Sequence, residues 1–208
     1  MFSVWVLVGE KVSSFTLIEL VTVIALVSIF LFFLIKQNVT VGNETQQVKV
    51  AALLLALGFD EARGRAIEGN TYAKVFVDGS SDLKFRRVMV MKQTQNSWKA
   101  EREILLPERT FVLSLNDLSE YLGGGSLPYV YTEDQVIWQG EPIDGNCFIF
   151  NPEGYLSNVA PVVLGIGYGA KVGNDIKLKK DVNIRGLLIT VTGKGIILES
   201  KNAIKEAI

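Results

Sequence analysis

The segment Ser14-Phe15-Thr16-Leu17-Ile18-Glu19-Leu20-Val21 opens an apolar run that continues to Ile35 and carries one carboxylate near its start. About 20 apolar residues are enough to cross a bilayer as a helix. An ionised Glu in such a helix costs about 2.5–3.5 kcal/mol, so it is usually kept for a partner or a function. The run therefore predicts a transmembrane helix over residues 15–35 in which Glu19 has a role.

This segment resembles the N-terminal signature of type IV prepilins and pseudopilins. In that family a small residue precedes the cleavage site, Phe begins the mature chain and Glu is its fifth residue. Ser14, Phe15 and Glu19 stand at those places, although most members have Gly or Ala where this chain has Ser14. The resemblance implies a leader over residues 1–14 and a prepilin peptidase that cuts after Ser14 and methylates the new amine of Phe15.

The resemblance also implies a place for the helix, first as a single-pass anchor in the bacterial inner membrane and later in a filament core. There Glu19 would face the amine of Phe15, and each charge would relieve the cost of burying the other. A plain single-pass anchor with a stray Glu is the alternative interpretation.

Beyond the anchor, apolar residues recur every three or four positions, which is the pattern of an amphipathic helix. This stripe consists of Val48, Ala52, Leu55, Phe59, Ala62 and Ala66. We expect an amphipathic helix half over residues 36–69, continuous with the anchor from Phe15 to about Ile67. The polar stretch before the stripe, which contains Gly42, leaves open an anchor, a hinge and a separate short helix.

From Tyr72 onward the hydrophobic period changes to two, as in half-buried strands. Strands are predicted over Tyr72–Val77, Phe85–Met91, Trp98–Leu106, Thr110–Leu115 and Val162–Tyr168. Residues 118–145 are predicted as a long irregular stretch with one short strand around Tyr129–Trp138. Hairpins are expected over Cys147–Asn158 and Leu187–Glu199.

The predicted fold class is therefore α+β, with a long N-terminal helix packed on an antiparallel β-sheet domain over residues 70–208. Four later landmarks resemble the minor pseudopilin H family of type II secretion and the related minor pilin T family. They are Ala62–Ile67, Ile104–Pro107, Phe148–Gly154 and Ile189–Gly195. The resemblance implies a pilin fold with a periplasmic β domain.

Composition restricts the chemistry that this chain can perform. It has no His, one Cys and a formal net charge of −1, which removes His-based catalysis and any intrachain disulfide. We therefore predict no enzyme, no cofactor and no metal site, although Asp144-Gly145-Asn146 leaves calcium open. Cys147 is predicted to be a buried small hydrophobe, and the glycines of Gly165–Gly169 to allow close packing in a strand.

Two basic groups suggest a second function. Arg86 and Arg87 form one, and Lys177, Lys179, Lys180 and Arg185 form a possible basic patch near the end of the chain. The predicted function is a minor pseudopilin subunit that assembles with other pseudopilins for protein export across the outer membrane. The alternative is a minor type IV pilin of an uptake apparatus that binds DNA through the basic patch.

Overall fold

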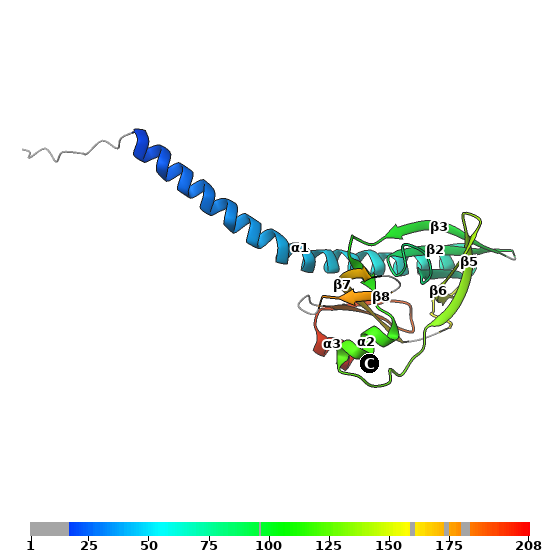
Figure 1. Cartoon of the computed structure of the whole chain (residues 1–208). Helices are drawn as coiled ribbons and strands as arrows, with labels where there is room; N and C mark the ends of the chain where they lie inside the picture. The colour runs from blue at the N-terminus through cyan, green and yellow to red at the C-terminus, as the bar shows by residue number, and fades with distance from the viewer. Residues whose placement is uncertain (1–16, 96, 159–160, 173–174, 180–183) are drawn as a thin grey trace, which may run out of the picture. The chain divides into compact units, whose positions relative to one another are not determined.

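The computed structural model describes residues 17–95, 97–158, 161–172, 175–179 and 184–208 (Figure 1). The chain divides into two compact units, Met1–Gly42 and Asn43–Ile208. Helix α1 (Leu17–Gly69) contributes to both. The order of one long helix followed by antiparallel strands confirms the predicted class, but the strands form two sheets where one was expected.

The first sheet belongs to the second unit and has five strands, each antiparallel to its neighbours. Their order is β3 (Ser97–Leu105), β2 (Arg87–Thr94), β1 (Ala73–Asp78), β6 (Glu141–Phe150) and β5 (Thr132–Trp138).

The second sheet is antiparallel as well. Its order is β10 (Gly195–Leu198), β9 (Arg185–Ile189), β7 (Val162–Val172) and β4 (Thr110–Val112). Strand β8 (Asp175–Leu178) pairs with the end of β7.

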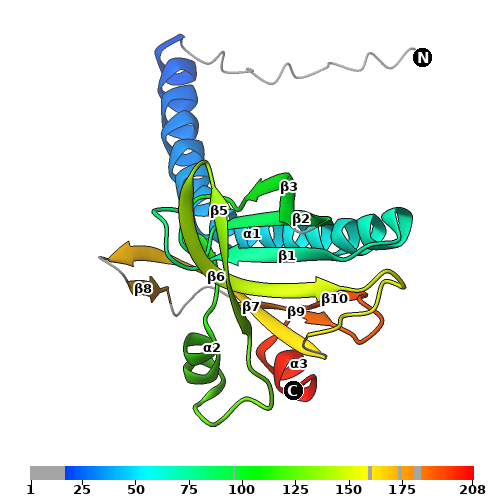
Figure 2. The same cartoon turned by 90° about the vertical axis from the view of Figure 1, so that its right-hand side faces the viewer.

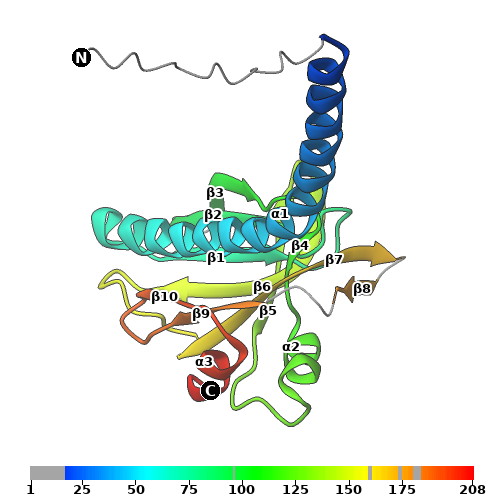
Figure 3. The ribbon, with the colours of Figure 1, turned by 90° about the vertical axis from the view of Figure 1, so that its left-hand side faces the viewer.

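The main core lies where α1 meets both sheets. All six residues of the predicted stripe on α1 are fully buried. They share one cluster with alternate residues of β1 and β6 in the first sheet and of β7 and β9 in the second. Figures 2 and 3 show β1 and β6 running beside the part of α1 that belongs to this unit. The apolar face of the helix and the apolar faces of the strands therefore pack together in one core.

The opposite face of each sheet has its own smaller cluster, because side chains alternate along a strand. On the first sheet this cluster contains Phe76, Met89, Cys147 and the half-buried Trp98 and Trp138. On the second sheet, helices α2 (Leu115–Leu122) and α3 (Lys201–Glu206) cover the other face.

Both of these short helices were missed in the sequence. The strand predicted over Thr110–Leu115 ends at Val112, and the stretch that begins at Leu118 is helical up to Leu122. The cause is local capping: the Ser114 hydroxyl accepts the Asp117 N–H at 3.1 Å, and Gly123 ends the helix in the left-handed conformation. Ser200 caps α3 in the same way.

The hairpin predicted over Cys147–Asn158 is confirmed only in its turn: the chain reverses after Phe150, and the N–H groups of Asn151 and Ser157 donate to the carbonyls of Tyr155 and Ile149. Strand β6 instead begins at Glu141 and pairs with β5 through a turn at Gln139 and Gly140, whose φ angles are 53° and 91°. Positive φ at both central residues fits a tight hairpin turn. On the returning segment, Leu156 forms one antiparallel bridge to Phe150, so this segment is not a full strand.

Candidate interaction surfaces

The N-terminal motif lies at the margin of the described chain. Ser14 and Phe15 fall outside the described residues, and Glu19 is described only as backbone of α1. Exposed apolar side chains follow on the same helix, with exposed fractions of 50–62% at Val21, Val23, Ile24, Leu26 and Val27. Of the helices in the described ranges, none combines the length and hydropathy that a membrane crossing requires.

The part of α1 in the second unit has two apolar faces. Its inner face carries Phe59, whose ring centroid lies 5.4 Å from that of Phe148 and 6.1 Å from that of Phe150. Its outer face carries Val50, Leu53 and Leu57, which are 44–54% exposed. Their spacing of three and four residues places them on one side of the helix. An exposed apolar stripe of this kind is a candidate contact surface for another subunit.

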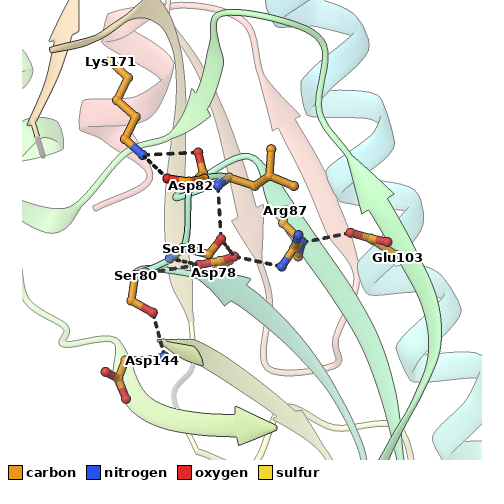
Figure 4. A network of polar contacts seen from close by, with 9 residues as sticks. Asp78, Ser80, Ser81, Asp82, Arg87, Glu103, Asp144 and Lys171 are labelled. Carbon is orange, nitrogen blue, oxygen red and sulfur yellow. Dashed lines mark hydrogen bonds and ion pairs between the residues drawn. The ribbon is translucent and has the colours of Figure 1, made fainter. Parts of the chain in front are cut away.

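A buried carboxylate organises the loop between β1 and β2 (Figure 4). Asp78 is fully buried and accepts the backbone N–H groups of Ser80 and Ser81 at 3.0 and 2.9 Å. It also lies 3.5 Å from Arg87, whose Nε is 2.9 Å from Glu103. The loop that follows β1 is thus anchored by the buried charge of Asp78.

The same loop is tied to other elements. The Asp144 N–H donates to Ser80 Oγ at 2.9 Å, and Lys171 of β7 donates to the Asp82 carbonyl at 3.2 Å (Figure 4). Arg86, next to the loop, donates to the Leu106 carbonyl at 3.1 Å. Arg86 and Arg87 therefore serve the fold, and neither forms part of an open basic surface.

A lysine of β1 is an unexpected member of the interior. Lys74 is fully buried, and its ammonium lies 2.5 Å from Asp134 of β5 and 4.4 Å from the ring centroid of Trp98 of β3. One charge on the central strand thus contacts both edge strands of the first sheet. The ion pair and the ring compensate the cost of burying the ammonium.

The single thiol lies close to this ion pair. Cys147 is buried on β6, as predicted. Burial raises the pKa of the Cys147 thiol to about 11, and the negative charge of Asp134 adds to the effect. A thiol of this kind stays protonated at neutral pH and is a poor nucleophile.

The possible basic patch is divided in the structure. Lys180 lies outside the described residues, and Arg185 is turned inward, where it donates to the Glu199 carbonyl at 2.5 Å. Lys179 forms an ion pair with Glu44 of α1 at 2.7 Å. Lys177 and Lys179 line a cavity of about 570 Å³ whose wall also contains Asp117, Glu120, Tyr121 and Lys201.

That cavity supplies an aromatic ring that the sequence does not place near the patch, since Lys201 lies 4.8 Å from the ring centroid of Tyr121. Two carboxylates on the same wall weaken any field that would attract a polyanion. Across the described residues, no group of three or more Cys, Asp or Glu side chains is arranged to hold a metal ion.

Three of the sequence landmarks meet at the C-terminal end of α1. A Cβ on Gly154 would lie 2.7 Å from Cδ1 of Ile67 and 3.3 Å from Cγ of Arg63. A Cβ on Gly193 would lie 2.7 Å from the Gly154 carbonyl oxygen and 3.1 Å from Cδ of Arg63. Both glycines have positive φ, 84° and 75°. Glycine is favoured at both positions, because a side chain would crowd these neighbours and strain a backbone of positive φ.

Comparison with solved structures finds similarity to two minor subunits. The minor pseudopilin EpsH of the type 2 secretion system of Vibrio cholerae is 12% identical, with a TM-score of 0.44, over 74% of this chain and 97% of that chain. The type IV minor pilin FimU of Pseudomonas aeruginosa strain PAO1 is 14% identical, with a TM-score of 0.43, over 76% of this chain and 91% of that chain.

A second crystal form of FimU gives a TM-score of 0.41 at 14% identity, over 74% of this chain and 94% of that chain. No family model matches the chain, and no curated protein matches it. Both solved proteins are of the class that the N-terminal segment resembles. Because the TM-scores are below 0.5, the functional proposal rests on the residues of this chain.

Proposed function

We propose that this chain is a non-enzymatic minor subunit of a pseudopilus, the short pilin-type filament of type II secretion, and that it contributes to protein export across the outer membrane. The observation that carries the proposal is one helix with three consecutive properties. It carries Glu19 near its start, continues as an apolar run, and ends with a buried stripe on antiparallel sheets; the Ser14-Phe15 junction precedes it in the sequence.

In this proposal the apolar run of residues 15–35 anchors the chain in the bacterial inner membrane, with the β domain in the periplasm. A prepilin peptidase removes residues 1–14 and methylates Phe15. Assembly then moves the helix from lipid into the filament, where Glu19 binds an N-terminal amine. The outer stripe of Val50, Leu53 and Leu57 supports this step, because it offers neighbouring subunits an apolar surface outside the domain's own core.

Processing gives the first test. Co-expression with a prepilin peptidase should shorten the chain by its 14 leader residues and leave N-methylated Phe15, as measured by mass spectrometry of the membrane form. If the chain stays intact, Ser14→Gly separates two causes. Rescue by Gly would mean that Ser14 is a poor cleavage residue, whereas continued failure would contradict the proposal.

Assembly gives the second test. Glu19→Ala should insert and be cleaved normally, because it makes the helix more apolar, but it should recover fewer partner pseudopilins from membranes at equal expression. Glu19→Asp keeps the charge with a shorter reach and should recover an intermediate amount. Equal recovery by wild type and Glu19→Ala would remove the role proposed for Glu19.

DNA binding by an uptake pilin is the second candidate, and the described residues favour it less. Lys179 and Arg185 pair with acidic residues of their own chain, and Asp117 and Glu120 adjoin Lys177. The steep salt dependence of DNA affinity comes from clustered unpaired cations, and the described residues of the patch do not form such a cluster. DNA binding that falls steeply with salt and is lost in Lys177→Ala would reverse this preference.

A further inference from the structure

The corner where α1 meets Gly154 and Gly193 contains a guanidinium, that of Arg63, for which the described residues provide no charged partner. The stem of Arg63 is clasped between Gly154 and Gly193, whose missing side chains leave it just enough room. Its Nε is buried, and within the described ranges Arg63 has no hydrogen-bond or ion-pair partner. Most buried donors in native proteins are satisfied, so an unpaired one calls for an explanation.

Backbone hydrogen bonds order the two segments that pack against Arg63. The Gly154 N–H donates to the Asn151 carbonyl at 2.8 Å, and the Leu156 N–H donates to the Val191 carbonyl at 3.1 Å. The Gly193 N–H donates to the Thr190 carbonyl at 2.8 Å. The stem of Arg63 therefore packs against two backbone segments that are already ordered, so that less conformational freedom is lost when a partner binds.

Apolar side chains on the segments of this corner are exposed to solvent. Ile67, Tyr155 and Val191 are 47%, 48% and 52% exposed. They belong to the same three segments, since Ile67 contacts Gly154 and the neighbour of Tyr155 is bonded to Val191. Arg and Tyr are both enriched among the residues that contribute most to binding in protein interfaces.

We propose that this corner, made of Arg63, Ile67, Gly154, Tyr155, Val191 and Gly193, is a docking site for another subunit of the filament, and that Arg63 binds a carboxylate of that subunit beside an apolar side chain. The inference rests on the proposed function, because it names a partner surface for the same assembly. A planar guanidinium matches a carboxylate with two parallel hydrogen bonds.

A polyanion suits the corner less well than a single carboxylate. Polyanion binding draws on several clustered cations. Here the guanidinium of Arg63 is one cation, and Glu68, Glu153 and Lys194, which follow or precede the corner residues in the sequence, give the surrounding segments mixed charge. Charge complementarity thus favours one acidic side chain from a protein over nucleic acid or anionic lipid.

The experiment uses the full chain, co-expressed with its partner pseudopilins and extracted in detergent. A photoreactive benzoylphenylalanine at Val191 should cross-link to a partner subunit, and mass spectrometry should find Asp or Glu in the cross-linked peptide. Arg63→Gln should reduce the recovered partner about tenfold or more. The matched control Arg65→Gln should change recovery little, because exposed ion pairs such as those of Arg65 contribute little.

Charge exchange separates binding from folding. Arg63→Glu should abolish recovery, and changing the identified partner carboxylate to Arg should restore it, which a misfolded variant could not show. Equal recovery by Arg63→Gln and wild type, or a cross-linked peptide without an acidic residue, would overturn the inference. Cross-linking to lipid, nucleic acid or a second copy of this chain would overturn the choice of occupant.

The two proposals fail in different ways. If the wild-type chain recovers no pseudopilin under any condition and is not processed, the proposed function fails. If it is processed and recovers partners that Arg63→Gln recovers equally, only the docking site is wrong.

Discussion

Replacing Phe59 tests whether the stripe on α1 is the centre of the fold. Phe59 is fully buried and touches the rings of Phe148 and Phe150, at centroid distances of 5.4 and 6.1 Å. Phe59→Ala removes a large side chain from a packed core, which typically lowers the free energy of unfolding by about 3–5 kcal/mol. Domains of this size are stable by only about 5–15 kcal/mol, so the loss should be large.

A graded series refines that magnitude. Phe59→Leu keeps most of the volume but loses two aromatic pairs worth about 0.5–1.5 kcal/mol each, so it should cost about 1–3 kcal/mol. Phe59→Asp should prevent folding, because an unpaired charge would be buried. Leu57→Ala, on the outer face of the same helix, is the control and should stay within about 0.5–1 kcal/mol.

Urea unfolding of the full chain in detergent provides the measurement. Trp98 and Trp138 lie in the cluster on the opposite face of the first sheet, so their fluorescence reports unfolding of the domain and not a local change around Phe59. A loss below about 1 kcal/mol for Phe59→Ala, or an equal loss for Leu57→Ala, would mean that α1 does not pack through the predicted stripe.

Three further predictions follow from packing and ionisation. Residues 43–208 should be soluble and β-rich by circular dichroism when expressed alone, since they form one compact unit; aggregation would count against this. Gly193→Ala should lower stability by about 1–3 kcal/mol, whereas Gly64→Ala, where a Cβ meets no atom within 4 Å, should raise it by about 0.5–1 kcal/mol, both measured by thermal unfolding. Stability should fall as pH rises above about 9, because the Cys147 thiol ionises there in the unfolded chain but not in the folded one, where its pKa is about 11. In a plot of the urea midpoint against pH, Cys147→Ala should flatten this part of the profile. An unchanged profile would contradict the assignment.

The long helix, its buried face and most strand positions could be predicted because they depend on local periodicity. The stripe from Val48 to Ala66 recurs at helical spacing, and a helix with such a stripe can bury it in only one way. Strands β1, β2, β3, β7 and β9 were recognised for the corresponding reason, since alternation reports which face is buried. The position of Cys147 in an apolar run was sufficient to predict its burial.

Features that depend on only a few local residues, or on strand pairing, were predicted poorly from the sequence. Helix α2 begins with Ser114 and Asp117 and ends at Gly123, a signature that a search for capping residues would have found. The β5–β6 hairpin depends on the Gln139-Gly140 turn, a weaker signal than Asn-Gly or Asp-Gly. The division of the strands into two sheets depends on which strands pair, and alternation within a strand carries no information about its neighbours.

By itself, the sequence determined the class of this protein: an apolar helix with one early carboxylate, an amphipathic continuation, and strands behind it. Only the tertiary structure decided what the charged residues do. Lys74 can be buried because Asp134, 60 positions away in the sequence, lies 2.5 Å from its ammonium. Lys179 forms an ion pair with Glu44, which belongs to the opposite end of the domain's sequence. The stem of Arg63 packs against two glycines, Gly154 and Gly193, that lie on other segments of the chain. Periodicity is a property of neighbouring residues, whereas the partner of a charge is set by chain crossings that no local pattern encodes.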